Sequence, residues 1–357
     1  MEIWSRQTGG ERIAKLTRRE ILRCGASIAT AISTGELLFP ASTLAATPTP
    51  LPPPETNTIR IACFGCDAPI MAAERYLRQE GFTDIEITGA TSPPEFESAL
   101  ASGKVHLGPM DPPQFASNVQ RGQAVVGFGS LHPGCLEIWA HEGIGSLTDL
   151  RGRTIVVGSK AISDPPYSYI SIVLKYAGVD PKEVNFVAQT GANPVNLYLE
   201  GKNDAVRVGA DRAPALKANP ANKGHMVHSQ LMDDPWSKLA CCILVTTQDW
   251  YHSNPVAAKR AIRAIFRAAD FQPDDRADAV KPLTDKGFFG GASNFDNVLA
   301  AADMVPANWR DLDTEKTVRF YGKLLTDVGL LTKSVDEVAK ALDLRIFNEL
   351  RTELKKY

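Results

Sequence analysis

The stretch Ile59-Arg-Ile-Ala-Cys-Phe64 and the residues that follow it, Gly65-Cys-Asp-Ala-Pro69, carry the pattern that decides the fold. A short apolar run bounded by turn residues is typical of a buried β-strand. An aspartate with a proline two residues later is typical of a helix start, because aspartate caps the first turn and proline fits the first helical positions. We therefore expect a strand over residues 59–64 and a helix over residues 70–79, which Gly81 ends.

The same alternation of strand and helix continues along the chain. Further strands are predicted at residues 85–88, 105–109, 125–128, 136–139, 150–157, 184–187, 205–208 and 239–246. Further helices are predicted at residues 93–101, 114–120, 167–176, 195–200, 214–218, 256–269, 314–328 and 335–341. This order predicts an α/β protein with mostly parallel sheets covered by helices.

The length of 357 residues suits two lobes better than one core. We expect residues 58–145 and 243–357 to form lobe 1 and residues 146–242 to form lobe 2, with two strands joining them as a hinge. A cleft between two lobes that close by a hinge motion is a common site for a small molecule.

The N-terminal region predicts export. Thr17-Arg-Arg-Glu-Ile-Leu-Arg23 has the twin-arginine signature, a weakly hydrophobic run follows, and Ala45-Ala46 is a plausible cleavage point. We interpret residues 1–46 as a twin-arginine signal segment and residues 47–57 as a proline-rich spacer, which predicts a periplasmic protein.

The charge of the chain excludes one class of partner. It has 39 lysine and arginine residues and 41 aspartate and glutamate residues, a net charge of -2. Nucleic acid requires a basic surface, so we do not expect it as a partner.

Cysteine usage predicts no metal site and no cofactor. Of the six cysteines, one lies in the signal segment, which leaves an odd number, so at least one thiol stays unpaired in an oxidising compartment. Cys63 and Cys66 have the CxxC spacing, but no second CxxC or histidine pair completes a zinc site. We expect Cys241 and Cys242 to be small buried strand residues on opposite faces.

Five predicted strand-to-helix junctions share an aspartate or asparagine with a proline close behind it. They begin at Asp67, Asp111, Asp164, Asn193 and Asp211. In open α/β sheets ligands bind at the carboxyl ends of the strands, where helix N-termini present free N–H groups. Capping alone also explains each junction. The carboxylates could equally accept hydrogen bonds from an amine, amidine or hydroxyl ligand, so the charge of the ligand stays open.

The predicted ligand-binding residues lie at these junctions and beside them. The expected contacts of lobe 1 are Cys66, Asp67, Met110, Asp111, Pro112, His132 and Gly134, and those of lobe 2 are Ser163, Asp164, Tyr167, Ser168, Asn193 and Asp211. Tyr167 suits a stacking or hydroxyl contact, and packing on the helix surface explains it equally well. No catalytic residue is predicted.

Several segments in order resemble a known family. They are Ala99-Leu-Ala-Ser-Gly-Lys-Val-His-Leu-Gly108, Gly145-Ser-Leu-Thr-Asp-Leu-Arg-Gly-Arg-Thr-Ile-Val-Val157, Val173-Leu-Lys-Tyr-Ala-Gly-Val-Asp-Pro-Lys-Glu-Val184, Glu200-Gly-Lys-Asn-Asp-Ala-Val206 and Asp343-Leu-Arg-Ile-Phe-Asn-Glu-Leu350. Together they resemble the substrate-binding proteins of nitrate, sulfonate and taurine ABC importers. The resemblance covers residues 58–355. It implies the type II periplasmic-binding-protein fold, a small-molecule ligand, an ABC permease with its ATPase as partners, a monomer, and no catalysis.

Two alternatives stay open at this point. One is an enzyme on the same fold that acts on a pyrimidine or aromatic precursor. The pyrimidine branch carries a cysteine-rich motif with more cysteines in one run than Cys241-Cys242, and His132 is the only histidine we consider as a base. The other alternative is a subunit that binds a ligand and signals to a membrane sensor. We see no arginine in a pattern that would clamp a sulfonate or nitrate.

Overall fold

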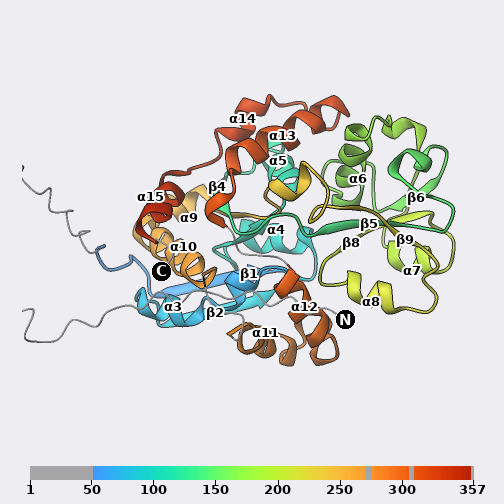
Figure 1. Ribbon diagram of the computed structural model, residues 1–357. Coiled ribbons are helices and arrows are strands. Elements are labelled where there is room, and N and C mark those ends of the chain that lie inside the picture. The colour runs from blue at the N-terminus through green and yellow to red at the C-terminus, as the bar shows by residue number, and fades with distance from the viewer. Residues whose placement is uncertain (1–50, 271–274, 305–308, 355–357) are drawn as a thin grey trace, which may run out of the picture. The chain divides into compact units, whose positions relative to one another are not determined.

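The computed structural model describes residues 51–270, 275–304 and 309–354, so the predicted signal segment lies outside the described residues. The chain from Leu51 to Tyr357 forms one compact unit. Within the described part of the chain, every helix is too short or too polar to cross a membrane. The unit has two lobes, each with its own strands and helices (Figure 1).

Lobe 1 is built on five strands: β1 (Thr58–Cys63), β2 (Asp84–Gly89), β3 (Gly108–Met110), β4 (Val125–Ser130) and β10 (Ile243–Thr247). β1 pairs in parallel with β2. β10 lies between β3 and β4 and runs antiparallel to both. A parallel bridge between Ile61 and Leu107 joins β1 to the segment before β3, so the five strands act as one twisted layer.

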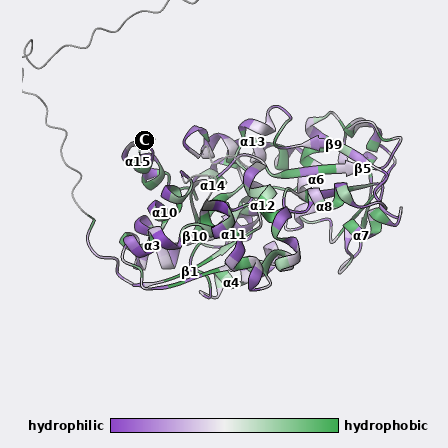
Figure 2. Cartoon of the chain, turned by 60° about the horizontal axis from the view of Figure 1, so that its bottom comes forward, coloured by the Kyte–Doolittle hydropathy of each residue, from purple (hydrophilic) through white to green (hydrophobic). Residues whose placement is uncertain are grey.

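Helices cover both faces of this layer. They are α2 (Ala68–Met71), α3 (Glu74–Gln79), α4 (Pro93–Ala101), α5 (Pro112–Gln120), α9 (Gln248–Ser253), α10 (Pro255–Ala268), α11 (Asp275–Asp285), α12 (Phe295–Met304), α13 (Thr314–Asp327), α14 (Val335–Ala339) and α15 (Arg345–Glu353). Successive side chains of a strand point to opposite faces. Accordingly, Ile59 and Ile61 pack with α3, α10 and α15, whereas Ala62 belongs to the core beneath α4, α5 and α13. Figure 2 shows the hydrophobic residues along the strands and the hydrophilic residues on the outer turns of the helices.

Lobe 2 contains the remaining strands: β5 (Leu136–Ala140), β6 (Thr154–Val157), β7 (Asn185–Ala188), β8 (Ala205–Gly209) and β9 (His225–Ser229). β6 pairs in parallel with β7, and β5 lies between β8 and β9, antiparallel to both. The helices α6 (Pro165–Tyr176), α7 (Pro194–Leu199) and α8 (Ala213–Ala218) surround these strands (Figure 1). The sheets are therefore mixed: β1–β2 and β6–β7 have the predicted parallel pairing, whereas β10 and β5 do not.

Two short segments, residues 131–135 and 239–242, connect the strands of the two lobes, and we call them the crossings. The crossings pair with each other. The N–H of Leu131 donates to the carbonyl of Cys242 at 3.2 Å, and the N–H of Cys241 donates to the carbonyl of His132 at 3.0 Å. An antiparallel bridge joins Pro133 to Ala240. This pair of segments is the predicted two-strand hinge. β5, which precedes the predicted boundary at residue 145, pairs with β8 and β9, which follow it.

Aromatic side chains hold the two lobes together beside the crossings. Trp236, which precedes the second crossing, is buried against Phe320 and Tyr321 of α13 and against Tyr169 of α6. Tyr176 of α6 also contacts Phe320, with ring centroids 5.8 Å apart. The lobes are therefore packed against each other in this structure.

Four local predictions differ from the structure. The helix over residues 70–79 is divided into α2 and α3, because the N–H of Ala73 bonds to the carbonyl of Ile70, only three residues back. The strand predicted over residues 150–157 begins only at Thr154, because Gly152 has a positive φ of 73° and turns the chain. Residues 239–242 form the second crossing rather than the start of β10. β9 was not among the predicted strands.

Candidate functional site

The crossings bring together side chains from three separate segments. Cys66 and Asp67 follow β1, His132 and Cys135 belong to the first crossing, and Cys241 and Cys242 belong to the second. We call these six residues the crossing cluster. All six are buried, and Asp67 has no exposed surface. A carboxylate, an imidazole and four thiols thus share a region of low dielectric, where their mutual interactions are strong.

His132 has a defined orientation in this cluster. Its Nδ1 lies 2.7 Å from the carbonyl oxygen of Pro133. A carbonyl can only accept a hydrogen bond, so Nδ1 carries a proton. Its Nε2 lies 3.3 Å from Oδ1 of Asp67. Burial lowers the pKa of His132, but its contacts with Asp67 and Cys66 outweigh burial and raise that pKa well above its ordinary value.

Asp67 does not cap a helix, although the sequence predicts that it does. The side chain of Asp67 makes no capping hydrogen bond to α2. Its Oδ2 instead accepts from the N–H of Phe64 at 2.8 Å, while Oδ1 faces His132. Burial, with the nearby Cys66, raises the pKa of Asp67 to about 7. This carboxyl group is therefore held inside the protein near its point of half-ionisation at neutral pH.

The thiols of the cluster lie within contact distance of one another. The Sγ atoms of Cys135 and Cys241 are 2.8 Å apart, and those of Cys241 and Cys242 are 3.8 Å apart. The prediction that Cys241 and Cys242 lie on opposite faces of a strand is wrong, because the chain leaves the sheet there and both thiols join the cluster. Contacts with Cys135 and Cys242 lower the pKa of Cys66 well below its ordinary value. All described cysteines are free thiols.

Cys63, the other member of the CxxC sequence, is separate from this cluster. Its Sγ donates to the carbonyl of Thr88 at 3.5 Å, and burial raises the pKa of its thiol well above the ordinary value. It occupies the face of β1 that packs against α10. The two cysteines of the CxxC sequence therefore have different surroundings and do not act as a pair.

An arginine of lobe 2 faces an aspartate of lobe 1. Arg207 lies in β8, and its Nη2 is 3.9 Å from Oδ2 of Asp111, which caps α5 by accepting from the N–H of Gln114 at 2.7 Å. The guanidinium also lies 5.8 Å from the centre of the Tyr169 ring. Its Nε is buried and has no hydrogen-bond partner among the described residues. Burial raises the pKa of Asp111 to about 6 in spite of Arg207.

Two tyrosines and a glutamine lie near Arg207 and Asp111. Tyr169 of α6 bonds through its hydroxyl to Nε2 of His228 at 2.9 Å. Gln230 donates from Nε2 to the hydroxyl of Tyr321 at 2.7 Å, and its Oε1 accepts from the N–H of Cys135 at 3.1 Å. Gln230 follows β9 and Tyr321 lies in α13, so this hydrogen bond joins the two lobes. Burial raises the pKa of both tyrosines.

Two glycines allow the lobes to approach closely at the crossings. A Cβ atom on Gly134 would lie 2.1 Å from Cβ of Gln230, and one on Gly65 would lie 2.7 Å from Oδ2 of Asp211. Gly65 follows β1 in lobe 1, whereas Asp211 follows β8 in lobe 2, so the contact spans the lobes. Burial and the nearby Cys66 raise the pKa of Asp211. Asp211 does not cap α8, because the capping position is Arg212.

The structure thus gathers part of the predicted ligand-binding set at or beside the crossings: Cys66, Asp67, Asp111, His132, Gly134 and Asp211. Met110 and Pro112 are buried on either side of Asp111. The remaining predicted residues have local roles. Asp164 and Asn193 cap α6 and α7, and Ser163 and Asn193 are exposed. Ser168 donates to the carbonyl of Pro165 at 3.4 Å, and the Tyr167 ring packs on Phe186.

Five residues of this region were missed by reasoning from the sequence: Cys135, Tyr169, Arg207, Gln230 and Tyr321. Arg207 left no clear signal, because an arginine between Val206 and Val208 is also typical of a strand with one buried and one exposed face. Gln230 and Tyr321 left none, because only the packing of the lobes brings them together.

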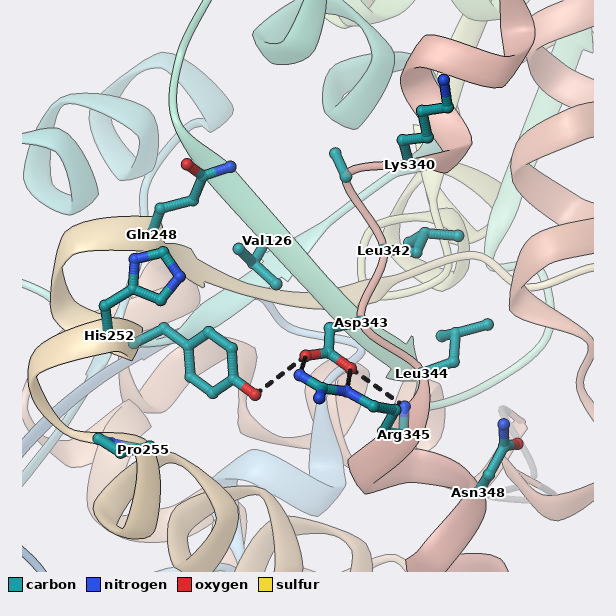
Figure 3. A pocket seen from close by; sticks show the side chains of 12 residues that line it. Val126, Gln248, His252, Pro255, Lys340, Leu342, Asp343, Leu344, Arg345 and Asn348 are labelled. Carbon is teal, nitrogen blue, oxygen red and sulfur yellow. Dashed lines mark hydrogen bonds and ion pairs between the residues drawn. The ribbon is translucent and has the colours of Figure 1, made fainter.

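A pocket lies elsewhere on lobe 1. It has a volume of about 780 Å³ and is lined by residues of β4, α9 and the segment that leads into α15. Figure 3 shows Asp343 at its centre, where Tyr251 donates to Oδ2 at 3.0 Å and Arg345 forms an ion pair. None of the predicted ligand-binding residues lines this pocket. Its carboxylate already has two partners, so we give it no role in ligand capture.

Known proteins share this fold and this sequence pattern. The sequence model of a protein family described as NMT1/THI5 like matches residues 68–279. No curated protein sequence matches the chain significantly.

Solved structures extend the likeness over most of the chain. The alkanesulfonate-binding protein SsuA from Xanthomonas axonopodis pv. citri, bound to MOPS, is 16% identical, with a TM-score of 0.62 over 81% of this chain and 99% of that one. The periplasmic nitrate-binding protein NrtA from Synechocystis PCC 6803 is 14% identical, with a TM-score of 0.65 over 85% and 90%. The desulfurization enzyme DSZB is 15% identical, with a TM-score of 0.55 over 83% and 100%. At these identities the likeness establishes the periplasmic-binding-protein fold alone.

Proposed function

The chain belongs to the NMT1/THI5-like family, and from that premise we propose that it is an exported solute-binding protein that captures a small polar or anionic ligand between its lobes and delivers it to an ABC permease. The fold is shared with binding proteins for an alkanesulfonate and for nitrate, which is consistent with such a role. Export, the permease and its ATPase, and a monomeric state all belong to this proposal.

The observation that carries the proposal is the half-buried side chain of Arg207. Its Nε is buried and has no hydrogen-bond partner in the described part of the chain, and its ion-pair contact with Asp111 is long, at 3.9 Å. An arginine can bind a carboxylate, sulfonate or phosphate through two parallel hydrogen bonds. We propose that an anionic group of the ligand takes this place when the lobes separate and close again. Tyr169 beside the guanidinium offers the ligand an apolar ring face, and Asp111 suits a second group that donates hydrogen bonds.

We propose that the lobes divide at the crossings, so that lobe 2 comprises residues 136–238 rather than 146–242. This division keeps β5 with its partners β8 and β9. Of the residues predicted to bind the ligand, we retain Met110, Asp111, Pro112, Gly134 and Asp211, and we add Arg207, Tyr169 and Tyr321; Cys66, Asp67 and His132 belong to the neighbouring crossing cluster. A ligand held there would contact both lobes and stabilise the closed form.

Thermal unfolding tests the proposal. The mature protein is heated with inorganic anions, sulfonates, aromatic acids, amino acids and pyrimidines in turn. A true ligand raises the melting temperature, because it binds only the folded state. We expect Arg207→Gln to weaken its affinity by at least ~30-fold, since a buried charge partner is lost. Arg207→Lys should recover little, because lysine cannot form the planar pair.

Lys202→Gln is the matched control, because it removes a positive charge from lobe 2 at an exposed position that pairs with Glu200. It should leave affinity unchanged. Equal affinities of Arg207→Gln and the wild type for the same ligand would refute the assignment of Arg207.

Tryptophan fluorescence reports lobe closure independently. Trp236 contacts rings from both lobes, whereas Trp250 stacks on His106 within lobe 1. We expect the ligand to change the emission of the wild type and of Trp250→Phe, and to change that of Trp236→Phe much less. If a ligand binds without this pattern of fluorescence changes, its binding does not alter the packing of the two lobes around Trp236.

A second function, an enzyme on the same fold that acts on a pyrimidine or aromatic precursor, is favoured by one observation. Cys66 has a lowered pKa and lies beside His132, whose other neighbour is Asp67. A thiol next to an imidazole is the usual arrangement of a cysteine nucleophile. The desulfurization enzyme DSZB shares the fold. Incubation with the same compounds and mass spectrometry of the mixture decides: a new product that disappears in Cys66→Ala supports the enzyme, and stabilisation without product supports the binding protein.

Export is tested on the N-terminal segment itself. A fusion of residues 1–57 to a reporter that is active only outside the cytoplasm should be exported in a bacterium with the twin-arginine machinery. Replacement of Arg18 and Arg19 by lysine should abolish export. An unchanged signal from the double-lysine variant would remove the twin-arginine assignment and leave the binding function untouched.

A further inference from the structure

Four side chains of the crossing cluster bring atoms that can bind a metal ion close together. The ligand atoms of Cys66, Asp67, His132 and Cys242 all lie within 4.8 Å of one another, and all four residues are buried. They come from the end of β1 and from both crossings, so the fold rather than a sequence motif assembles them. Two thiols, an imidazole and a carboxylate are all side chains that bind zinc-like ions.

The spacing suits a four-coordinate ion. A tetrahedral zinc ion holds nitrogen and oxygen at about 2.0 Å and sulfur at about 2.3 Å, which places neighbouring donors ~3.3 to 3.8 Å apart. Nε2 of His132 and Oδ1 of Asp67 are 3.3 Å apart, as such an ion requires. The remaining separations, within 4.8 Å, close by side-chain adjustments of about 1 Å, which is less than a rotamer change.

The orientation of His132 supplies an independent argument. Because Nδ1 donates to the carbonyl of Pro133 at 2.7 Å, the lone pair of a neutral imidazole is on Nε2, and Nε2 faces Asp67. Histidines that bind metals almost always donate their second nitrogen in this way, often to a backbone carbonyl. Without a cation or a proton between them, Nε2 and Oδ1 would direct lone pairs at each other inside the protein.

A proton alone explains less of the arrangement. An imidazolium paired with the Asp67 carboxylate would satisfy those two groups. It would leave unexplained why Cys66 and Cys242 converge on the same place, since an ion pair needs no thiols. A cation that prefers sulfur accounts for all four groups, and thiolates are its strongest ligands.

We propose that Cys66, Asp67, His132 and Cys242 form a tetrahedral site for a thiophilic d¹⁰ cation, with Zn²⁺ as its probe. Cys135 and Cys241 lie beside the site, where Cys241 contacts Cys242 at 3.8 Å. No metal was expected from the sequence, because these ligands are not close together along the chain. A bound ion would fasten the end of β1 to both crossings and would therefore stiffen the hinge.

Metal titration of the reduced full chain tests the site. After removal of metal with a chelator, Co²⁺ should bind with the visible bands of tetrahedral coordination and the near-ultraviolet charge-transfer band of a thiolate ligand. Zn²⁺ should displace it at one ion per chain. We expect Cys66→Ser and Cys242→Ser each to lower the Zn²⁺ affinity by ~100-fold or more and to remove the thiolate band.

Cys63→Ser is the matched control. It alters the other cysteine of the CxxC sequence, which is equally buried, and serine can keep the hydrogen bond to Thr88. This variant should bind Zn²⁺ as the wild type does. Equal loss in Cys63→Ser and Cys66→Ser would overturn the proposal, because it would mean that thiols bind the ion irrespective of position.

A measurement without variants covers the case in which a substitution prevents folding. These thiols are buried, so iodoacetamide reaches them only when the structure opens locally. The rate of modification at each cysteine of the wild-type protein is therefore followed over hours by mass spectrometry, with and without Zn²⁺. Zn²⁺ should protect Cys66 and Cys242 and leave the labelling of Cys63 unchanged. Unprotected thiols, or a native chain that lacks two hydrogens because a disulfide occupies the cluster, would refute the site.

Discussion

The helix starts beside the crossings, which include that of Asp211 in lobe 2, and the helix starts away from the crossings have similar local sequences and different surroundings. Asp67 and Asp111 lie beside the crossings, where burial raises the pKa of each carboxyl group. Asp164 and Asn193 cap α6 and α7, and each side chain accepts hydrogen bonds from the first turn of its own helix. An Asp-Pro junction therefore predicts a helix start, whereas the packing of the lobes decides whether it also belongs to a site.

The topology explains why these helix starts differ. β1 and β3 end next to the crossings, so the residues after them meet the other lobe. β6 and β7, which precede α6 and α7, pair with each other and lie on the far side of β8 from the crossings (Figure 1).

Gly134→Ala should be strongly destabilising. Its Cβ would meet Cβ of Gln230 at 2.1 Å and the carbonyl oxygen of the same residue at 2.8 Å, so the crossings would have to move apart. We expect a loss of about 3 kcal/mol in the free energy of unfolding, measured with urea. Gly145→Ala is the control, because its Cβ would meet nothing closer than 3.6 Å. Equal stability of the two variants would mean that the lobes do not approach as closely as described.

Asp67→Ala should cost more stability than Asp164→Ala. The first substitution leaves the buried N–H of Phe64 and Nε2 of His132 without their partner, which should lower the free energy of unfolding by about 3 kcal/mol. The second substitution removes a partly exposed helix cap, which should lower the free energy of unfolding by about 1 kcal/mol. Urea midpoints at pH 8 give the comparison. A larger cost for Asp164→Ala would reverse the contrast between the lobes.

Asp111→Asn should change how stability depends on pH. The carboxyl group is surrounded by Arg207 of β8, Glu97 of α4, Cys241 of the second crossing and Tyr321 of α13. Burial raises its folded pKa to about 6 from the ordinary 3.8, in spite of Arg207. The folded state therefore holds this proton more tightly than the unfolded chain does.

The stabilising contribution of the protonated form of Asp111 is complete below about pH 4 and is lost as the pH rises through about 6. The asparagine of the variant keeps an oxygen for the cap and has no proton to lose. The wild type should thus lose stability relative to Asp111→Asn between pH 4 and pH 7, by about 1 to 3 kcal/mol. Urea unfolding of both proteins at several pH values across this range measures the difference in their free energies of unfolding. A difference that stays constant with pH would mean that the carboxyl group is solvated in the folded state.

Tyr169→Phe and Tyr167→Phe form the smallest test, at two nearby positions of one helix. Tyr169→Phe removes the hydrogen bond to His228, which should lower the free energy of unfolding by about 1 kcal/mol, and it removes a hydroxyl next to Arg207. Tyr167, the tyrosine chosen from the sequence, packs its ring on Phe186 and should tolerate the loss of its hydroxyl. Thermal unfolding with and without ligand measures both effects. A change of ligand affinity in Tyr167→Phe alone would restore the original choice.

The fold was largely predictable, because the spacing of apolar residues indicates strands and helices, and capping and turn residues indicate where they begin and end. The helix predicted over residues 93–101 has these bounds in the structure, since Ser92 caps it and the apolar residues Phe96 and Leu100 lie one turn apart on its buried face. β9 was missed because His225-Met-Val-His-Ser229 lacks both alternation and a clear apolar run. Its place beside β5 depends on pairing with a distant strand, which local sequence does not encode.

The site was less predictable, for a physical reason. Asp111, Asp164 and Asn193 were correctly predicted as caps, because a cap depends on three or four consecutive residues. Partners such as Gln230 and Tyr321 are 91 residues apart and meet only when the lobes pack. The assembly of the crossing cluster likewise depends on the return of the second crossing beside the first.

The pairing of the two crossings has a mechanical consequence. When two rigid bodies turn about a common line, an atom on that line hardly moves, and the travel of any other atom grows with its distance from the line. His132 and Cys242 belong to the crossings themselves, so they lie near the axis of such a rotation. Asp111 and Arg207 belong to opposite bodies and must travel apart. In the proposed cycle, an ion at the axis would stay bound through every opening, while the guanidinium away from it would alternate between solvent and ligand.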